Sequence, residues 1–342
     1  MPNLNYKDAG VDRAAGEKTK KRIAALARQT HNANVLRDIG LFGGFYALAG
    51  NAFREPVLVS SVDGVGTKIK LAGRLQRYRG LGEDIVHHCL NDLMVCGADP
   101  LFFLDYLAFG RLEPAAVEEI VDGMAGACKQ ADCPLIGGET AEMPDLYRPG
   151  DFDIAGTIIG VVEKSRIIDG SAIGAGDRLI AIASNGLHTN GYSLARRILD
   201  AGNGLDVAAR YPGLEQTLGE ALLQPHRSYQ RILREVRQDP SLHGMAHVTG
   251  GGIVENVNRL LRPGLALRVD WDAWAWPALF RLLQHHGGVA VEEMRRVFNL
   301  GVGMVFIVAR EATGPFAGRL HELGESSWQI GEIVASSTSE GA

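Results

Sequence analysis

Short apolar runs and longer segments with apolar residues at helical spacing follow one another along most of the chain. The runs predict strands, and the segments in which apolar side chains recur every three or four positions predict amphipathic helices. The expected strands lie at 56–59, 101–107, 134–136, 152–162, 178–183, 245–248 and 305–308, and a closing strand ends near residue 334. The expected helices lie around 18–27, 82–96, 114–131, 192–199 and 215–237, from 252, up to 286, and before the closing strand. This mixture predicts an α/β (α+β) fold.

Glycines interrupt the pattern near the middle of the chain. Gly170, Gly174 and Gly176 follow the strand expected at 152–162, and the apolar pattern resumes at residue 178. A chain of 342 residues has the usual length of two domains. We therefore expect a first domain at 1–168 and a second at 169–342.

The composition is that of an ordinary globular protein apart from its glycine content. Hydrophobic residues make up 46% and charged residues 22%, but the chain has 43 glycines, well above the average of roughly 7%. The glycines cluster after apolar runs, where α/β proteins bring loops close to ligands. The net charge is −5 and no basic tract stands out, which argues against nucleic-acid binding. The basic residues at 18–22 are interpreted as a solvated helix face.

The sequence shows neither a membrane segment nor a secretory signal. No apolar run approaches the ~20 residues that span a bilayer, and the first residues lack the charged and apolar regions of a signal peptide. The four cysteines, Cys89, Cys96, Cys128 and Cys133, form no C-x-x-C pair. We therefore expect a cytoplasmic protein whose thiols are reduced and structural.

The stretch from Ser60 to Lys68 carries the first candidate chemistry. It follows an apolar strand and contains an acid, two glycines, a hydroxyl and a base, in the order Asp63-Gly64-Val65-Gly66-Thr67-Lys68. Glycines let the backbone approach a ligand, the N–H groups of such a turn can face an anion, and a carboxylate can hold a hard cation. The spacing differs from a P-loop. These parts suit a metal-bound polyphosphate, and the alternative is a strand-to-loop turn with a surface lysine.

A second candidate cluster lies on the helix expected at 82–96. It contains Asn91 and Asp92, and an asparagine is unfavourable inside a helix. Mg²⁺ bound beside phosphate groups uses one or two protein carboxylates. Asp63 and Asp92 are therefore predicted to face one cavity and to hold Mg²⁺. The neighbouring His87 and His88 are interpreted as surface or packing histidines.

A third cluster follows the strand expected at 134–136. Gly137 and Gly138 precede Glu139 and Thr140, at a strand end where α/β folds place ligands. Glu139 is a third candidate for the metal, and the alternative is a tight turn with a charged rim.

Two loops in the second half each carry a histidine among polar and glycine residues. Residues 184–191 read Ser-Asn-Gly-Leu-His-Thr-Asn-Gly, and residues 247–252 read His-Val-Thr-Gly-Gly-Gly before a helix. A helix N-terminus binds anions, and histidine can transfer a proton near neutral pH. The loops therefore predict a second anionic ligand, apart from the metal-bound polyphosphate. The candidate residues in these loops are Asn185, His188, Thr189, Asn190, His247, Thr249, Gly250, Gly251 and Gly252.

Taken together, these stretches resemble the phosphoribosylformylglycinamidine cyclo-ligase family, also called AIR synthetase, of purine biosynthesis. The matching stretches are 6–12, 63–68, 91–93, 102–106, 137–144, 247–252 and 298–304, and residues 92–100 fit the pattern D-x₄-G-A-x-P. The resemblance runs from residue 6 to about 334. The loop at 184–191 departs from the family's S-S-G-x-H-S-N-G at Asn185 and Thr189. His87 and His88 lie outside the pattern, and no nucleotide-binding lysine is carried over to 18–22.

The resemblance implies a two-domain AIR-synthetase-like fold with mixed sheets and helices packed on one face. The first domain would bind ATP and pair its sheet with that of a second subunit in a homodimer, and the second domain would lie on the substrate side. ATP would phosphorylate the formyl oxygen of formylglycinamidine ribonucleotide, and a nitrogen of the same molecule would then attack the activated carbon. The products would be aminoimidazole ribonucleotide, ADP and phosphate. The candidate residues of the two histidine-bearing loops, together with Asn299, would then bind the substrate. The catalytic candidates are His188, His247 and Asp92, and the general base stays open between the two histidines and neither.

Two alternatives remain. A kinase of the same superfamily could act on thiamine phosphate or selenide, but a selenide enzyme would show a reactive cysteine near its start, whereas the first cysteine here is Cys89. A nucleotide-binding scaffold without turnover belongs to a different class. The intact glycine loops and acids in both halves argue against it.

Overall fold

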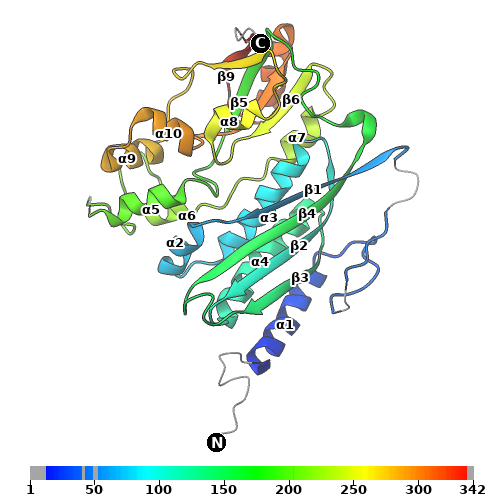
Figure 1. Ribbon diagram of the computed structural model, residues 1–342, viewed down its shortest axis with the longest axis vertical. Coiled ribbons are helices and arrows are strands. Elements are labelled where there is room, and N and C mark those ends of the chain that lie inside the picture. Colours follow the sequence, from blue (N-terminus) through cyan, green and yellow to red (C-terminus); the bar gives the residue numbers. More distant parts are fainter. Residues whose placement is uncertain (1–12, 41–42, 49–52, 203, 337–342) are drawn as a thin grey trace, which may run out of the picture. The chain divides into compact units, whose positions relative to one another are not determined.

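The computed structural model describes residues 13–40, 43–48, 53–202 and 204–336, so the stretch at 6–12 lies outside the described residues. The chain divides into two compact units (Figure 1). Unit 1 comprises the chain up to Leu93 together with Ala98–Ser165, and unit 2 comprises Met94–Gly97 and the chain from Arg166 onward. Both units combine strands and helices, which confirms the α/β (α+β) class. No helix in the described ranges is long and apolar enough to cross a membrane.

Unit 1 is built on a four-stranded sheet with the order β1-β4-β2-β3. Its strands are β1 (Pro56–Gly64), β2 (Asp99–Phe109), β3 (Leu135–Glu142) and β4 (Phe152–Glu163). Its helices are α1 (Arg13–Arg28), α2 (Lys68–Leu75), α3 (Arg79–Met94) and α4 (Pro114–Ala131). The pair β2–β3 is parallel, whereas β4 is antiparallel to both β1 and β2, so the sheet is mixed as expected.

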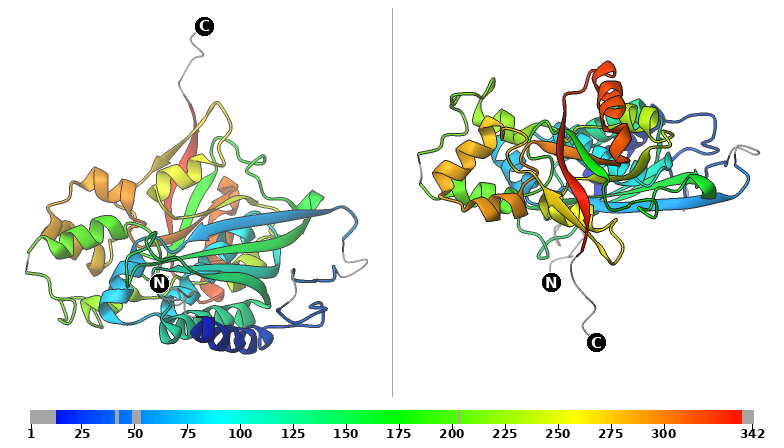
Figure 2. Two further views of the ribbon diagram at one scale, coloured as in Figure 1. Left: turned by 60° about the horizontal axis from the view of Figure 1, so that its bottom comes forward. Right: turned by 90° about the horizontal axis from the view of Figure 1, so that it is seen from above.

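Helices cover one face of this sheet. A methyl group at Gly156 of β4 would come within 2.3 Å of Phe103 and 2.8 Å of Ile85 on α3, so α3 packs directly onto the strand. Helix α4 packs against β2 and β3, and α1 packs against α4 and β3 on the same side (Figure 2). Side chains alternate along a strand. Leu58 and Val62 of β1 therefore point to the opposite face, where they are 61% and 69% exposed.

Two boundaries in unit 1 differ from the prediction. Strand β1 continues through Ser60–Gly64 because these residues pair with β4, so Asp63 is a strand residue. The predicted loop at Gly137–Thr140 is wrong in the same way, since β3 runs to Glu142 and pairs with β2. Glycines stand there because a Cβ on Gly138 would lie 2.1 Å from Oδ1 of Asp105.

Unit 2 contains a five-stranded sheet with the order β6-β8-β5-β9-β7, and every pair is antiparallel. Its strands are β5 (Arg178–Ala183), β6 (Leu242–His247), β7 (Leu265–Val269), β8 (Val302–Val308) and β9 (Ser327–Ala335). Its helices are α5 (Tyr192–Asp200), α6 (Leu218–Leu223), α7 (Gln230–Val236), α8 (Gly252–Asn258), α9 (Ala278–Gly287), α10 (Val291–Val297) and α11 (Thr313–Glu322). All of β8 is buried, and α11 packs against β5 and β9 (Figure 2).

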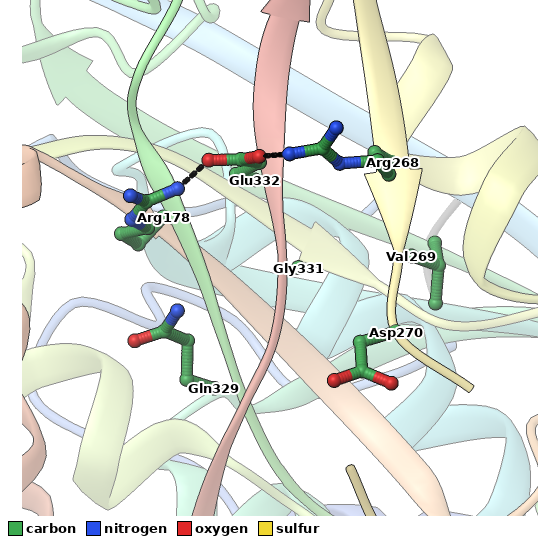
Figure 3. Close-up of a pocket in the computed structure, with 7 residues that line it drawn as sticks. All are labelled: Arg178, Arg268, Val269, Asp270, Gln329, Gly331 and Glu332. Carbon is green, nitrogen blue, oxygen red and sulfur yellow. Dashed lines mark ion pairs between the residues drawn. The ribbon is translucent and has the colours of Figure 1, made fainter. Parts of the chain in front are cut away.

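A row of charges crosses three neighbouring strands of unit 2 (Figure 3). Glu332 on β9 forms ion pairs with Arg178 on β5 and Arg268 on β7, and the sheet register places each arginine directly opposite it. Opposite charges at such cross-strand positions stabilise strand pairing. Glu332 and the two arginines line a pocket of about 420 Å³, and its lining also includes Asp270 and Gln329. Because these arginines are already paired with Glu332, we interpret the row as part of the sheet's own stability.

Candidate functional site

The end of β1 brings a carboxylate to helix α3. Oδ2 of Asp63 lies 3.0 Å from Nε2 of His88, and Oδ2 of Asp92 lies 3.6 Å from the same nitrogen. His88 and Asp92 share one face of α3 because they are four residues apart. The His88 ring is almost fully buried, whereas the two carboxylates keep side-chain exposures of 39% and 32%. The structure therefore brings the two predicted metal ligands to one point, with a buried histidine between them.

The histidine shifts the proton equilibrium of its neighbours. Burial alone would raise the pKa of Asp63, but the hydrogen bond and charge of His88 outweigh it, so this pKa lies below its ordinary value. Burial would lower the pKa of His88, but the hydrogen bond that His88 donates to Asp63, together with the charge of Asp92, raises it above its ordinary value. The contact thus favours a protonated His88 beside an ionised Asp63.

Lys68 lies inside unit 1. Its side chain is 1% exposed, and its Nζ donates to Oδ1 of Asp84 on α3 at 2.8 Å. Burial lowers the pKa of Lys68, and the carboxylate of Asp84 acts in the opposite direction. This buried lysine therefore ties the start of α2 to α3.

The remaining residues of the β1–α2 turn shape the backbone. The N–H group of Val65 donates to the carbonyl of Ile154 at 3.3 Å, and its side chain is fully buried. Gly66 has φ of 67°, a conformation that glycine adopts without strain. Thr67 precedes α2 without a side-chain cap, and Asn91 is fully buried.

A second site in unit 1 is a pocket of about 590 Å³ at the β3 edge. Its lining includes Gly137, Gly138, Glu139 and Thr140 of β3, together with Lys20 and Lys21 of α1 and Gly43 and Gly44. The two lysines are exposed, as predicted for a solvated face, but they also border this pocket. Periodicity could not show this, because the pocket depends on how α1 packs beside β3.

Glu139 lies apart from the Asp63–Asp92 pair. The register connects Asp63 to Gly156, Gly156 to Asp105, and Asp105 to Gly138, which precedes Glu139. Three strand spacings of about 4.8 Å separate the two edges by roughly 14 Å. One ion held by Asp63 and Asp92 therefore does not reach Glu139, which belongs to the β3 pocket.

Asp105 is a buried acid in that pocket. Burial raises its pKa to about 7, its own backbone hydrogen bond opposes the shift, and the charge of Glu139 adds to it. The sequence analysis included Asp105 only in the matching stretch 102–106 and did not predict this pKa shift, because the shift depends on burial in the folded unit.

The stability of the protein should fall as Asp105 ionises. The folded-state pKa of about 7 lies above the ordinary aspartate pKa of 3.8, so between these values the folded state holds a proton that the unfolded state lacks. Stability from this group therefore decreases from about pH 4 to about pH 7 and is constant above. Between pH 5.5 and pH 8 we expect a loss of about 2 kcal/mol, which Asp105→Asn should abolish. Urea unfolding at both pH values measures it, and exposed Asp153→Asn should keep the wild-type difference.

In unit 2, Asn299 holds the 184–191 loop. The hydroxyl of Ser184 donates to Oδ1 of Asn299 at 3.1 Å, and Nδ2 of Asn299 donates to the carbonyl of Gly186 at 2.8 Å. Nδ2 of Asn185 donates to the carbonyl of Pro225 at 2.8 Å. His188, inside this loop, has φ of 61°, a strained value for a residue with a side chain.

The 247–252 loop runs from β6 into α8. Thr249 donates its hydroxyl to Asn256 at 3.1 Å, and the Asn256 amide donates to the carbonyl of Gly252 at 2.8 Å. A Cβ on Gly251 would lie 1.9 Å from a carboxylate oxygen of Glu255. The chain's own carboxylate therefore covers the start of α8, where the sequence predicted an anion. Asn190 approaches the loop from the other side, since a Cβ on Gly250 would lie 3.1 Å from its Oδ1.

The two loops place His188 and His247 near each other. Their ring centroids are 6.3 Å apart, and both side chains are buried. His226 lies beside both, with ring centroids 3.9 Å from His188 and 4.9 Å from His247. The sequence analysis missed His226, because it lies in a segment without the glycines that marked the other two.

The fold and these sites define a two-domain protein of the AIR synthase type. The family model for the AIR synthase related protein N-terminal domain matches residues 49–162, and the model for the C-terminal domain matches residues 174–341. The phosphoribosylformylglycinamidine cyclo-ligase of Trichlorobacter lovleyi is 47% identical over 339 residues, which cover 99% of this chain and 97% of that protein. That of Pseudothermotoga lettingae is 47% identical over 331 residues, 97% of each chain. The chain belongs to the phosphoribosylformylglycinamidine cyclo-ligase family.

Solved structures share the fold at much lower identity. A thiamine-monophosphate kinase from Stenotrophomonas maltophilia aligns with a TM-score of 0.65 and 19% identity over 95% of both chains. The hydrogenase maturation protein HypE of E. coli aligns with a TM-score of 0.68 and 18% identity, over 93% of this chain and 91% of that one. At such identity these likenesses establish the fold alone.

Proposed function

We propose that this enzyme closes the imidazole ring of formylglycinamidine ribonucleotide in purine biosynthesis, forming aminoimidazole ribonucleotide, ADP and phosphate. The observation that carries the proposal is the 47% identity to cyclo-ligases over 97–99% of the chain. Because the similarity spans both units, it includes every candidate site described above. The reaction makes a C–N bond with ATP, which is the chemistry of a ligase.

Asp63 and Asp92 fit a Mg²⁺ site. Their Oδ2 atoms face one point, both carboxylates are partly exposed, and Mg²⁺ prefers carboxylate oxygens while keeping room for phosphate oxygens and water. The ion would supply charge neutralisation for the transferred phosphoryl group. His88 now contacts both carboxylates, so binding of an ion requires that His88 give up these contacts.

The nucleotide itself is proposed to bind in the first domain, residues 1–168. The β3 pocket of about 590 Å³ falls in the usual size range for small-molecule sites, and Lys20 and Lys21 at its rim can attract phosphate. Lys68 contributes a buried positive charge behind the β1–α2 turn. The proposed nucleotide-binding residues are Asp63, Gly64, Val65, Gly66, Thr67, Lys68, Asn91, Asp92, Gly137, Gly138, Glu139 and Thr140, with Lys20 and Lys21 added.

The ribonucleotide substrate is proposed to bind in the second domain, residues 169–342. The two histidine-bearing loops support this, because they gather polar groups around buried imidazoles that can hold or move a proton. The proposed residues are Asn185, His188, Thr189, Asn190, His247, Thr249, Gly250, Gly251, Gly252 and Asn299. His188, His247 and Asp92 stay the catalytic candidates.

The reaction needs positioning and charge neutralisation rather than a protein nucleophile. The formyl oxygen of the substrate attacks the γ-phosphorus of ATP, and the bond from phosphorus to ADP breaks. A nitrogen of the same substrate then attacks the carbon that carries the phosphorylated oxygen. That carbon–oxygen bond breaks, phosphate leaves with the oxygen, and the nitrogen loses a proton to a nearby base.

Product analysis tests the proposed function. Purified enzyme with ATP, Mg²⁺ and the amidine ribonucleotide should release one ADP for each aminoimidazole ribonucleotide formed. Absence of cyclised product would rule the assignment out. The same assay with thiamine phosphate or selenide tests the alternative of a superfamily kinase, which only the shared fold supports. Nucleotide binding without substrate-dependent ADP release would indicate a scaffold.

A homodimer formed through the open face of the unit 1 sheet is proposed as well. Leu58, Val62 and Tyr106 expose 61%, 69% and 38% of their surfaces on that face. Exposed apolar side chains grouped on one sheet face are typical of an interaction surface. A second copy of the chain is the occupant, since the family resemblance implies sheet pairing between first domains.

The substitution Val62→Glu should convert the dimer into a monomer. A carboxylate on the exposed face of β1 would have to be desolvated at the interface without a partner, which costs several kcal/mol in two symmetric copies. Sedimentation velocity measures the change. Leu146→Glu, at an equally exposed apolar residue outside the sheet, is the control and should stay dimeric. A monomeric wild type, or a dimeric Val62→Glu variant, would contradict the proposed interface.

A cytoplasmic location is proposed on the state of the cysteines. All four are free thiols, and Cys89, Cys128 and Cys133 are buried. Burial raises the pKa of these three thiols well above its ordinary value, which keeps them protonated and unreactive.

A further inference from the structure

Three buried histidines converge in unit 2 from three separate segments. His188 comes from the loop after β5, His226 from the segment between α6 and α7, and His247 from the end of β6. His188 and His226 are each 1% exposed, and His247 is 4% exposed. One ring nitrogen of each lies within 4.8 Å of the corresponding nitrogens of the other two.

The closest pair shows how the cluster is held together. Nε2 of His226 and Nε2 of His247 are 2.9 Å apart, so one donates a hydrogen bond to the other. Nδ1 of His226 lies 3.5 Å from the hydroxyl oxygen of Thr189. With the ring proton on Nδ1 and directed at such an oxygen, Nε2 is unprotonated and its lone pair can bind a metal. Metal-binding histidines show this arrangement.

The spacing is close to that of a trihistidine metal site. Zinc bound to histidine has Zn–N distances of about 2.0–2.1 Å, so tetrahedral geometry separates neighbouring ligand nitrogens by about 3.3 Å. The pair at 2.9 Å needs to open by only a few tenths of an ångström. The ring of His188 is stacked on that of His226, with planes 16° apart, so it must turn out of this stack to aim at a shared ion.

The backbone of His188 supports a role for this residue beyond packing. Its φ of 61° is in the left-handed region, which costs energy for a residue with a Cβ. Such backbone strain persists only where the surrounding structure fixes the conformation, and strained residues cluster at ligand-binding and active sites. In this loop the strain turns the imidazole inward, where the other two rings lie.

We propose that His188, His226 and His247 form a binding site for a first-row divalent transition metal, with Zn²⁺ as the representative ion. Imidazole nitrogens suit Zn²⁺, Ni²⁺ and Cu²⁺, whereas Mg²⁺ prefers oxygen. The site is therefore chemically distinct from the carboxylate pair of unit 1. Three protein ligands leave one tetrahedral position open to water or to an exogenous group.

The metal site has one consequence that rests on the proposed function. His188 and His247 are the residues proposed to face the ribonucleotide, so an ion held between them would compete with the substrate. Micromolar Zn²⁺ should then inhibit ring closure, and a chelator should restore it. Metal binding itself is measured without any substrate, so the two proposals fail separately.

Titration of untagged, chelator-stripped protein with Co²⁺ tests the site. We expect one Co²⁺ per chain, with the intense visible d–d bands of tetrahedral coordination, and displacement by an equivalent of Zn²⁺. His226→Gln keeps a polar side chain but removes the imidazole, and should weaken binding at least 100-fold, since the loss of a residue that only hydrogen-bonds to a metal ligand already costs 10- to 100-fold. Exposed His321→Gln is the matched control and should bind as the wild type does.

A second measurement needs no variant. In ¹H–¹⁵N spectra of the imidazole groups, Zn²⁺ should shift three of the ten histidines, including the one whose ring leaves its stack. Absence of stoichiometric tetrahedral Co²⁺ in the wild type would overturn the proposal. So would Co²⁺ binding that His226→Gln leaves unchanged, or Zn²⁺ shifts confined to histidines outside the cluster.

Discussion

The substitution Asp63→Asn should lower kcat/KM for ATP by about 10²–10³, the usual loss when one group that stabilises transition-state charge is removed. Oδ1 of Asp63 accepts a hydrogen bond from the N–H group of Gly64 at 2.7 Å, and the asparagine oxygen can keep it. The change therefore falls on Oδ2, the atom that faces His88 and Asp92. Losing this charge weakens the proposed Mg²⁺ site while leaving the backbone in place.

Mg²⁺ titration distinguishes this role from a structural one. The Asp63→Asn enzyme should need a higher Mg²⁺ concentration for half-maximal rate, with an unchanged melting midpoint to within a few degrees. Asp153→Asn is the control, because Asp153 on β4 makes the same kind of bond to the N–H group of its neighbour, Ile154, at 2.9 Å. Equal turnover by the Asp63→Asn variant and the control would remove Asp63 from the metal site.

Replacing Lys68 with methionine should destabilise the folded protein by about 3–5 kcal/mol, because it leaves the Asp84 carboxylate buried without its cation. Both side chains are at most 1% exposed, and their 2.8 Å bond joins α2 to α3. A long apolar side chain fills the space of the lysine stem, so the loss reports the charge rather than a cavity. Urea unfolding measures the free energy.

Two further variants make the test specific. Lys68→Met combined with Asp84→Leu removes both charges, and should recover most of the lost stability. Lys70 lies on the same helix as Lys68, and Lys70→Met breaks its ion pair with Asp151, but these two side chains are 41% and 34% exposed. Its cost should stay within about 1 kcal/mol. A Lys68→Met cost as small as that of Lys70→Met would contradict a buried pair.

The elements with strong local signals were predicted closely from the sequence. The helix expected at 114–131 forms as Pro114–Ala131, since proline suits its first turn and Asp132 ends it in a left-handed conformation. The strand expected at 178–183 forms as Arg178–Ala183. The residues of such elements themselves determine where the element begins, where it ends and which face is buried.

Elements that depend on their neighbours were harder to predict. Gly137 and Gly138 indicated a loop, yet they continue β3 because Gly138 lies against Asp105 on the next strand. Strand β7 was missed because its residues are only half-buried, and α10 because Met294 alone is buried. A weak apolar pattern does not separate such elements from a loop.

For the candidate site, too, the local positions were predictable and the tertiary contacts were not. The spacing of the strand end and the helix indicated that Asp63 and Asp92 meet, and the structure brings them to one point. The partners of these residues were not predictable, because the contact of His88 with both carboxylates and of Lys68 with Asp84 arises when α3 packs onto the sheet. His226 had no local signal at all, since only the folding of unit 2 carries it between two loop histidines.

The central claim is that this enzyme activates the formyl oxygen of its substrate by phosphorylation before the ring closes. Substrate labelled with ¹⁸O at the formyl oxygen tests this most directly. The enzyme should transfer the label to inorganic phosphate, with one labelled phosphate for each ring closed. Label that appears in water while the ring closes, or phosphate released without label, would contradict the account.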